Sequence, residues 1–216
     1  IYINVGNTAV LKQANESILC GDLKKVMIPL QTVDLLSEKF EEIKSIKKIN
    51  RDKILKTLKL EDNNCTFITW SAFDISNERK GFQYFIDSLK ELKNIMGQEV
   101  TNKICIFICG HTNTHMLNQL NELKYNYVTP GLLEREQYTE LLSMSDVYCS
   151  TTIEDAGPRT TYEAGAAATP IISFDNCNSI DFVNKNNGAL IKTYDVKGYA
   201  LAIAKMINLT EQEKLN

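Results

Sequence analysis

The pattern of hydrophobic and polar residues becomes regular near Cys65. Beyond it, short apolar runs alternate with segments whose apolar residues recur every three or four positions. The run Lys103–Cys109 is apolar almost throughout, which is typical of a strand buried on both faces of a parallel sheet. Strict alternation of strands and helices predicts an α/β fold with a doubly wound parallel sheet.

The expected elements follow one another in a simple order. Strands are expected at Thr66–Trp70, Lys103–Cys109, Tyr127–Thr129, Val147–Cys149, Ile171–Phe174 and Ala189–Ile191. Helices are expected at Gly81–Met96, Met116–Leu123, Glu136–Met144, Thr160–Ala168, Asn178–Asn184 and Val196–Ile207. Such sheets bind ligands beyond the carboxyl ends of their strands, so the residues that follow each strand are the informative ones.

The part of the chain before Cys65 has a different pattern. Lys24–Ile28 is expected to be a strand that ends at Pro29, and Glu38–Leu60 a Lys/Glu/Ile-rich helix packed on the α/β domain. The first residue is not Met and no signal-peptide pattern follows it, so we expect a start other than the natural one and no leader.

Composition narrows the class of protein. Of 216 residues, 44% are hydrophobic and 24% are charged, which is typical of an ordinary globular protein. A net charge of −3 gives no reason to expect nucleic acid as a partner. No apolar run approaches the roughly 18–20 residues that a membrane-spanning helix needs.

The six cysteines have no paired spacing, and several lie inside apolar runs. Buried free cysteines behave as small hydrophobic residues and stay reduced in the cytosol, so we expect a cytoplasmic protein without disulfides. The alternative is a metal site built from Cys109, His111 and His115. That cluster lacks an obvious fourth ligand, so no metal is expected.

Two adjacent cations, Arg79 and Lys80, stand at the expected start of the helix Gly81–Met96. Helix N-termini favour anions, so cations there oppose the helix dipole unless a phosphate lies between them. A solvated basic turn would explain the same residues.

Two acidic residues, Asp155 and Glu163, are separated by seven positions. Between them Gly157 and Pro158 break the loop, and proline suits the first turn of the helix that follows. Glu163 lies among small residues, where a carboxylate is costly without a partner. It is either a cap for a neighbouring loop or an acceptor for a ribose, and both interpretations stay open.

A tight turn is expected at Thr129–Leu132, after a short strand. It would bring backbone close to a planar base, although alone it is only a turn.

Together these segments resemble the C-terminal domain of family 4 glycosyltransferases, most closely the capsule and colanic-acid type of polysaccharide biosynthesis. That family has the GT-B architecture, two facing Rossmann-like domains with the active site between them. The resemblance implies that residues 1–23 are a remnant of the N-terminal acceptor domain and the connection, and that residues 24–216 bind the nucleotide sugar. The segments that carry it are Val26–Pro29, Asp34, Arg79–Phe82, Gly110, Gly131, Ser145–Val147, Asp155–Ala164, Thr169–Ile172 and Asn187–Gly188.

The resemblance also implies roles for individual residues. Lys80 and Arg79 would hold the donor diphosphate, Asp155 would face the donor sugar, and these three would be the catalytic residues. Glu163 would accept hydrogen bonds from the ribose, and the turn around Gly131 would meet the base. The donor-binding residues implied are Glu163, Gly157, Pro158, Arg159, Gly131, Leu132 and Gly110.

The chain departs from the family pattern at two places. The first acidic position of the motif is Asp155 instead of Glu, although Glu154 beside it could substitute. The arginine that usually precedes the Lys-Gly pair is replaced by the stretch Ser71–Ser76.

The implied activity is transfer of a sugar from a UDP- or GDP-sugar to a saccharide or lipid-linked acceptor, with retention of configuration and no cofactor. The missing half would carry the acceptor-side groups and any peripheral contact with the cytoplasmic face of a membrane. This chain alone is therefore expected to bind its donor without turnover. The alternatives are a non-catalytic GT-B partner subunit and a sugar-nucleotide epimerase.

Overall fold

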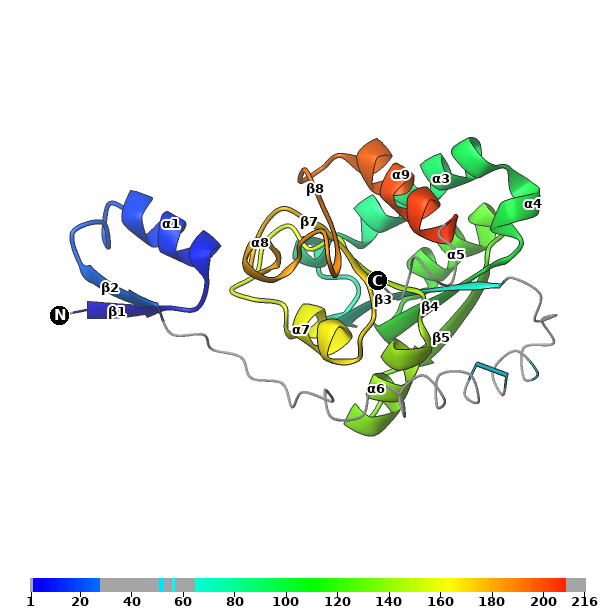
Figure 1. Ribbon diagram of the computed structural model, residues 1–216, viewed down its shortest axis with the longest axis horizontal. Coiled ribbons are helices and arrows are strands. Elements are labelled where there is room, and N and C mark those ends of the chain that lie inside the picture. The colour runs from blue at the N-terminus through cyan, green and yellow to red at the C-terminus, as the bar shows by residue number, and fades with distance from the viewer. Residues whose placement is uncertain (1, 28–50, 53–55, 57–64, 209–216) are drawn as a thin grey trace.

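A parallel sheet of six strands forms the centre of the protein, shown as a computed structural model in Figure 1. The structure describes residues 2–27, 51–52, 56 and 65–208. The strand order is β5-β4-β3-β6-β7-β8, and each neighbouring pair is parallel. The strands are β3 (Thr66–Asp74), β4 (Ile104–His111), β5 (Asn126–Gly131), β6 (Val147–Ser150), β7 (Ile171–Phe174) and β8 (Gly188–Ile191). The expected doubly wound parallel sheet is confirmed.

Helices cover both faces of this sheet (Figure 1). One face carries α3 (Phe82–Met96), α5 (Thr114–Leu123) and α9 (Val196–Ile207). The other carries α6 (Arg135–Met144) and α7 (Arg159–Ala166), and the short helices are α4 (Gln98–Thr101) and α8 (Ser179–Phe182). The chain winds outward from β3 to β5 and then returns to place β6 beside β3. The carboxyl ends of β3 and β6 therefore meet at the switch point where ligands of such sheets bind.

Trp70 fixes the packing at this switch point. Its ring lies 5.1 Å from the ring of Phe82 and 6.2 Å from that of Phe85, both on α3. Its Nε1 donates to the Thr151 hydroxyl at 2.9 Å, directly after β6. One buried side chain thus joins β3, α3 and the end of β6, so the loops that leave these elements start from a rigid base.

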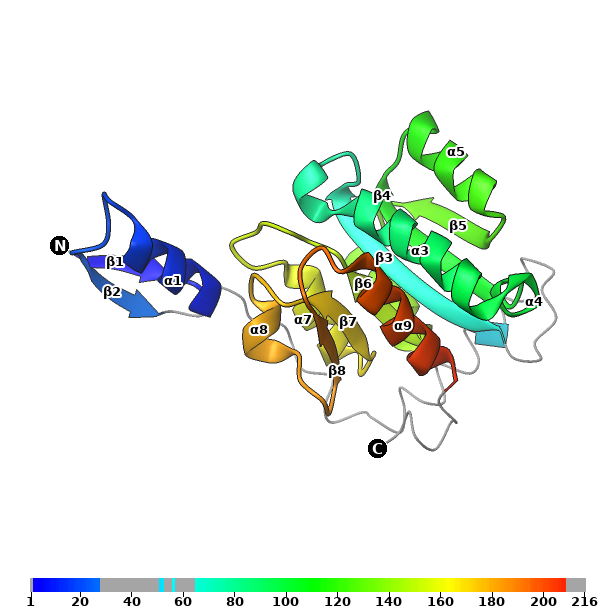
Figure 2. The same cartoon turned by 90° about the horizontal axis from the view of Figure 1, so that it is seen from above.

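A second, smaller unit lies beside the sheet (Figure 2). It contains β1 (Tyr2–Val5), α1 (Thr8–Glu16) and β2 (Lys24–Met27), and its two strands form a parallel pair of their own. The expected strand Lys24–Ile28 is present as Lys24–Met27, but it pairs with β1 and does not join the six-stranded sheet. The boundary between domains at residues 23 and 24 stays a prediction.

β7 and α9 have the expected bounds, and the other expected elements after Cys65 are present with shifted ends. β3 runs on to Asp74, past the expected end at Trp70, and α3 begins one residue later than expected because Gly81 has φ 71°, outside the helical range. The expected helix Glu38–Leu60 lies for the most part outside the described residues. No helix in the described part of the chain is long and apolar enough to cross a membrane.

Candidate functional site

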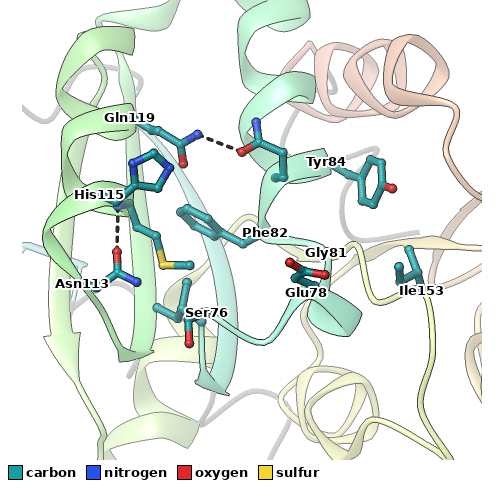
Figure 3. A pocket seen from close by; sticks show the side chains of 12 residues that line it. Ser76, Glu78, Gly81, Phe82, Tyr84, Asn113, His115, Gln119 and Ile153 are labelled. Atoms are coloured by element: carbon teal, nitrogen blue, oxygen red, sulfur yellow. Dashed lines mark hydrogen bonds between the residues drawn. The ribbon is translucent and has the colours of Figure 1, made fainter.

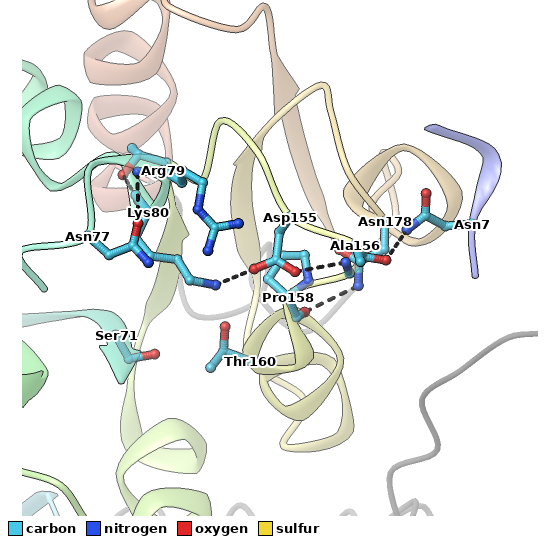
Figure 4. Close-up of polar contacts among 12 residues, drawn as sticks. Asn7, Ser71, Asn77, Arg79, Lys80, Asp155, Ala156, Pro158, Thr160 and Asn178 are labelled. Atoms are coloured by element: carbon cyan, nitrogen blue, oxygen red, sulfur yellow. Dashed lines mark hydrogen bonds and ion pairs between the residues drawn. The ribbon is translucent and has the colours of Figure 1, made fainter. Parts of the chain in front are cut away.

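Lys80 and Asp155 meet at the carboxyl ends of β3 and β6 (Figure 4). The Lys80 ammonium donates to an Asp155 carboxylate oxygen in an ion pair, and each side chain is about one-fifth exposed. The two residues are 75 positions apart in the sequence. Lys80 and Asp155 were both expected after strands, and the strand order brings them into contact.

Asp155 is held as an anion by this contact. Partial burial acts to raise the pKa of Asp155, but the Lys80 ammonium and the Gly157 N–H lower it by more, so it lies below the ordinary 3.8. Gly157 donates its N–H to Asp155 Oδ1 at 2.9 Å. The loop after β6 therefore presents a charged carboxylate in a fixed orientation.

A short turn carries the two cations. Glu78–Lys80 form a 3-10 turn, η2, and Gly81 follows it in the left-handed conformation before α3 begins. A Cβ at Gly81 would lie 1.9 Å from the Thr151 carbonyl oxygen, so only glycine allows this close approach. The Ile153 N–H also donates to the Arg79 carbonyl at 2.8 Å. The cations were expected in the first turn of α3, and that placement is wrong: they lie in a separate turn joined to the loop after β6.

Glu163 has a partner on its own helix. Arg159 Nε lies 2.9 Å from Glu163 Oε1 in an ion pair, one turn earlier in α7. The carboxylate is 25% exposed and the guanidinium 55%. No described hydrogen bond joins the Glu163 side chain to a neighbouring loop, and this ion pair supplies a partner for the carboxylate.

Gly157 and Pro158 set the start of α7. Gly157 is buried with φ 147°, and Pro158 is the residue before the first helical turn, which begins at Arg159. Asn178 holds this start, because its Nδ2 donates to the Pro158 carbonyl at 3.2 Å. Pro158 and Thr160, at the amino end of α7, lie beside the Lys80–Asp155 pair (Figure 4), and the first N–H groups of a helix have no partner within it.

A chain of hydroxyl groups connects β3 to the first turn of α7, and no pattern in the sequence predicted it. Ser71 Oγ lies 2.6 Å from the Tyr138 hydroxyl and 3.2 Å from that of Tyr148, which donates to Thr160 Oγ1 at 2.7 Å. Burial raises the pKa of Tyr148 to about 12, so the chain stays neutral. Ser71 belongs to the stretch that replaces the family's upstream arginine, and here it links the end of β3 to the first turn of α7.

The expected base-binding residues lie farther along the sheet. Gly131 ends β5 in a left-handed conformation with open space where a Cβ would stand, and Leu132 after it is half-exposed. Gly110 on β4 has another explanation, because a Cβ there would lie 1.7 Å from the Ala72 carbonyl oxygen of β3. These positions are one and two strands away from β3, and no described contact joins them to the Lys80–Asp155 pair.

A cavity of about 550 Å³ opens between the amino ends of α3 and α5 (Figure 3). Its lining includes Phe82, His115 and Ile153, and it shares Glu78 and Gly81 with the turn that carries the cations. Arg79, Lys80, Asp155 and Glu163 are not among the residues that line it. The Lys80–Asp155 ion pair therefore lies outside the lining of this cavity.

The three residues of the cysteine and histidine cluster lie in different environments. Cys109 is buried, and burial raises its pKa to about 12, whereas His111 and His115 are exposed. Among the described residues, no group of three His, Cys, Asp or Glu side chains is arranged to hold a metal ion.

Most of the chain matches the model of a known protein family. The family model described as "Glycosyl transferases group 1" matches residues 50–215, which include every candidate residue named above. The chain belongs to the group 1 glycosyl transferases. No curated protein matches it.

Several solved structures share the fold of this glycosyl transferase domain. It is similar to WaaG, "a glycosyltransferase involved in lipopolysaccharide biosynthesis", with 14% identity, a TM-score of 0.76, and coverage of 98% of this chain and 55% of that one. It is similar to an α,α-trehalose-phosphate synthase (UDP-forming) from Burkholderia vietnamiensis, with 11% identity, a TM-score of 0.74, and coverage of 99% and 55%. An E. coli protein titled "bound with UDP-2-fluoro glucose" aligns with 14% identity, a TM-score of 0.64, and coverage of 89% and 46%.

These identities show the fold alone: a Rossmann-like domain of the GT-B type. The chain spans about half the length of the structures that it matches.

Proposed function

We propose that this domain binds the nucleotide-sugar donor of a retaining, family 4 type glycosyltransferase. The observation that carries the proposal is the pairing of Lys80 with Asp155 at the switch point between β3 and β6, with Arg79 beside them. This edge is where doubly wound sheets bind nucleotides. An E. coli structure of the same fold is described as bound with UDP-2-fluoro glucose, which supports the same class of ligand here.

The cations would act on the leaving group. Arg79 and Lys80 lie in one turn beside the amino end of α7, so a diphosphate there would meet two positive side chains and free backbone N–H groups. Charge develops on the diphosphate as the bond to the sugar breaks, and preorganised positive groups stabilise that charge. Asp155 would then accept hydrogen bonds from the hydroxyl groups of the sugar.

Glu163 would bind the ribose. An ionised carboxylate accepts hydrogen bonds, and a ribose diol offers two adjacent donors. Its pairing with the half-exposed Arg159 leaves one carboxylate oxygen, Oε2, outside that described ion pair. Retention of configuration, the polysaccharide pathway and a saccharide or lipid-linked acceptor all follow from the family resemblance and are part of the proposal.

Calorimetry with UDP and GDP tests the proposal. Charge-assisted bonds of about 1.5–3 kcal/mol are at stake, so Lys80→Ala should weaken binding of the preferred nucleoside diphosphate at least about tenfold. The matched control is Lys90→Ala, which removes a lysine paired with Asp87 on the exposed side of α3. Equal affinity in wild type and Lys80→Ala would contradict the proposal.

A further inference from the structure

Asn7 connects the small amino-terminal unit to the candidate site. It precedes α1 as the N-cap, and its Oδ1 accepts from the Val10 N–H at 2.9 Å. Its Nδ2 donates to the Ala156 carbonyl oxygen at 2.6 Å, across 149 positions of sequence (Figure 4). The side chain is only 3% exposed. One amide thus starts the helix with its oxygen and contacts the loop after β6 with its nitrogen.

A second contact follows from the next residue. The Thr8 N–H donates to Asp181 Oδ2 of α8 at 2.8 Å. This N–H is one of the groups that an α-helix leaves free at its amino end, and a carboxylate is a favourable partner there. The amino end of α1 therefore contacts two segments of the larger unit, Ala156 and Asp181, and these contacts fix its direction.

The contacted loop is the one that carries Asp155. Ala156 follows Asp155 directly, and Asp155 is held on its other side by Lys80 and by the Gly157 N–H. Ala156 itself is exposed, so its own side chain does not anchor the loop. The loop is therefore held at the Asp155 carboxylate by Lys80 and the Gly157 N–H, and at the Ala156 carbonyl by the Asn7 amide.

We infer that Asn7 is a positioning residue, which holds the loop Asp155–Gly157 in the orientation that receives the sugar of the donor. The inference rests on the proposed function, because it needs Asp155 to face that sugar. It adds that a residue outside the six-stranded sheet, before β2, determines how well the sugar is recognised. The cations of η2 and Glu163 hold the nucleotide part and do not contact Asn7 in the described structure.

This arrangement predicts a selective effect. Loss of the Asn7 contact should weaken binding of a nucleotide sugar more than binding of the corresponding nucleoside diphosphate. A general loss of structure would weaken both ligands together. The ratio of the two affinities is thus a measurement that a purely structural role would not change.

Asn7→Asp separates the two roles of the side chain. Aspartate is as good an N-cap as asparagine, so the start of α1 is kept. An ionised carboxylate cannot donate a hydrogen bond, so the contact with the Ala156 carbonyl is lost. Asn7→Ser serves as a neutral companion, because serine caps helices but its side chain is too short to span the same contact. The matched control is Asn113→Asp, the same change at the N-cap of α5, where Asn113 Oδ1 accepts from the Met116 N–H at 3.0 Å.

Calorimetry with UDP and UDP-glucose, and with GDP and GDP-mannose as a second pair, measures the ratio. We expect Asn7→Asp and Asn7→Ser to lower nucleotide-sugar affinity about tenfold and diphosphate affinity less than about twofold, with Asn113→Asp unchanged. Equal losses for both ligands, or an unchanged ratio in both Asn7 variants, would overturn the inference.

Backbone amide exchange over residues 151–160, measured without ligand, keeps the two claims apart. Faster exchange in both Asn7 variants is the expected result, because the loop loses an anchor, and unchanged exchange would overturn the inference. If wild-type protein binds none of the four ligands, the proposed function fails, and the exchange measurement still decides whether Asn7 holds the loop.

Discussion

At the scale of single residues, binding of the proposed donor would exchange the partners of two carboxylates. Asp155 is paired with Lys80 and Glu163 with Arg159, so neither carboxylate waits unpaired. A diphosphate would draw Lys80 toward itself, and Asp155 would then turn its oxygens to the hydroxyl groups of the sugar. In the paired state each charged group has a partner of opposite charge and a fixed orientation. Holding the groups in this way lowers the free energy of unfolding only slightly.

Glu163→Gln tests the ribose role. The change removes the charge and replaces one acceptor with a donor, so donor affinity should fall by about 1–3 kcal/mol, roughly tenfold to a hundredfold. The free energy of unfolding should fall by only about 0.3–0.5 kcal/mol, because the pair with Arg159 is an exposed pair within one helix. Asp87→Asn removes a comparable pair in α3 and is the control for stability. A destabilised Glu163→Gln protein with normal affinity would contradict the ribose role.

Asp155→Asn tests the ion pair through its pH dependence. The pKa of Asp155 in the folded protein is lowered, so its contribution to stability is complete above the ordinary value of 3.8 and is lost as pH falls through the lower folded value. Below about pH 4 the melting temperature of wild type should therefore fall more steeply than that of Asp155→Asn. Parallel curves from pH 7 to about pH 2.5 would show that Lys80 contributes nothing through this carboxylate.

The sequence identified the charged residues of the site but not the contact between Lys80 and Asp155. Arg79, Lys80 and Asp155 stood out because they follow apolar strands. The Arg159–Glu163 pair was readable from its spacing of four residues, which places both on one side of a helix. The hydroxyl chain was not predictable, because Ser71 and Tyr138 are 67 positions apart and only the strand order brings them together.

At the scale of elements, the turn η2 and the loop after β6 behave as one piece. Gly81 allows the turn to touch the Thr151 carbonyl, and the Arg79 carbonyl accepts from the Ile153 N–H. The two segments that carry Lys80 and Asp155 are thus fixed to each other through their backbones, independently of the ion pair. The distance between the cation and the carboxylate is set by the fold.

Gly81→Ala tests this close approach. Gly81 and Gly97 both have a positive φ, of 71° and 77°, with ψ of 27° and 168°, but a Cβ at Gly97 meets nothing within 4 Å. Gly97→Ala should therefore cost only the backbone strain of about 1–3 kcal/mol. Gly81→Ala should cost roughly 1–3 kcal/mol more, because its Cβ overlaps the Thr151 carbonyl, and it should also weaken nucleotide binding. Equal losses in urea denaturation of the two variants would show that the contact is loose.

The pattern predicted the elements after Cys65 far better than those before it. Buried strands such as β4 are apolar throughout, and α3 buries a regular face, so both give strong signals. β1 and α1 were missed because β1 is a short strand with one buried residue and α1 has no buried residue at all. Asn7, as an N-cap, was the one local signal for α1. The apolar pattern after Asn7 is too weak to predict a helix.

At the scale of the whole molecule, the chain spans about half the length of the structures that it resembles. In the GT-B architecture the active site lies between two domains, and the described residues form the sheet of one domain and a small unit beside it. The small unit already touches the site through Asn7. The proposed donor side of the site therefore lies within the described residues of this chain.

The chain alone should bind its donor without transferring the sugar. We expect no product with a panel of UDP- and GDP-sugars and simple saccharide acceptors, because in the GT-B architecture the acceptor-side groups belong to the other domain. Product analysis by mass spectrometry measures this. Appreciable transfer by this chain would contradict the two-domain account.

The carboxyl ends of β3 and β6 are proposed to bind a nucleoside diphosphate through Lys80. The most direct test is the melting temperature of wild type and Lys80→Ala with UDP, GDP and ADP at millimolar concentration. A ligand at about 100 times its Kd stabilises the folded state by about 2.7 kcal/mol. We predict that UDP or GDP raises the melting temperature of wild type by several degrees and leaves that of Lys80→Ala nearly unchanged. No rise with any nucleotide, or the same rise in both proteins, would contradict the account.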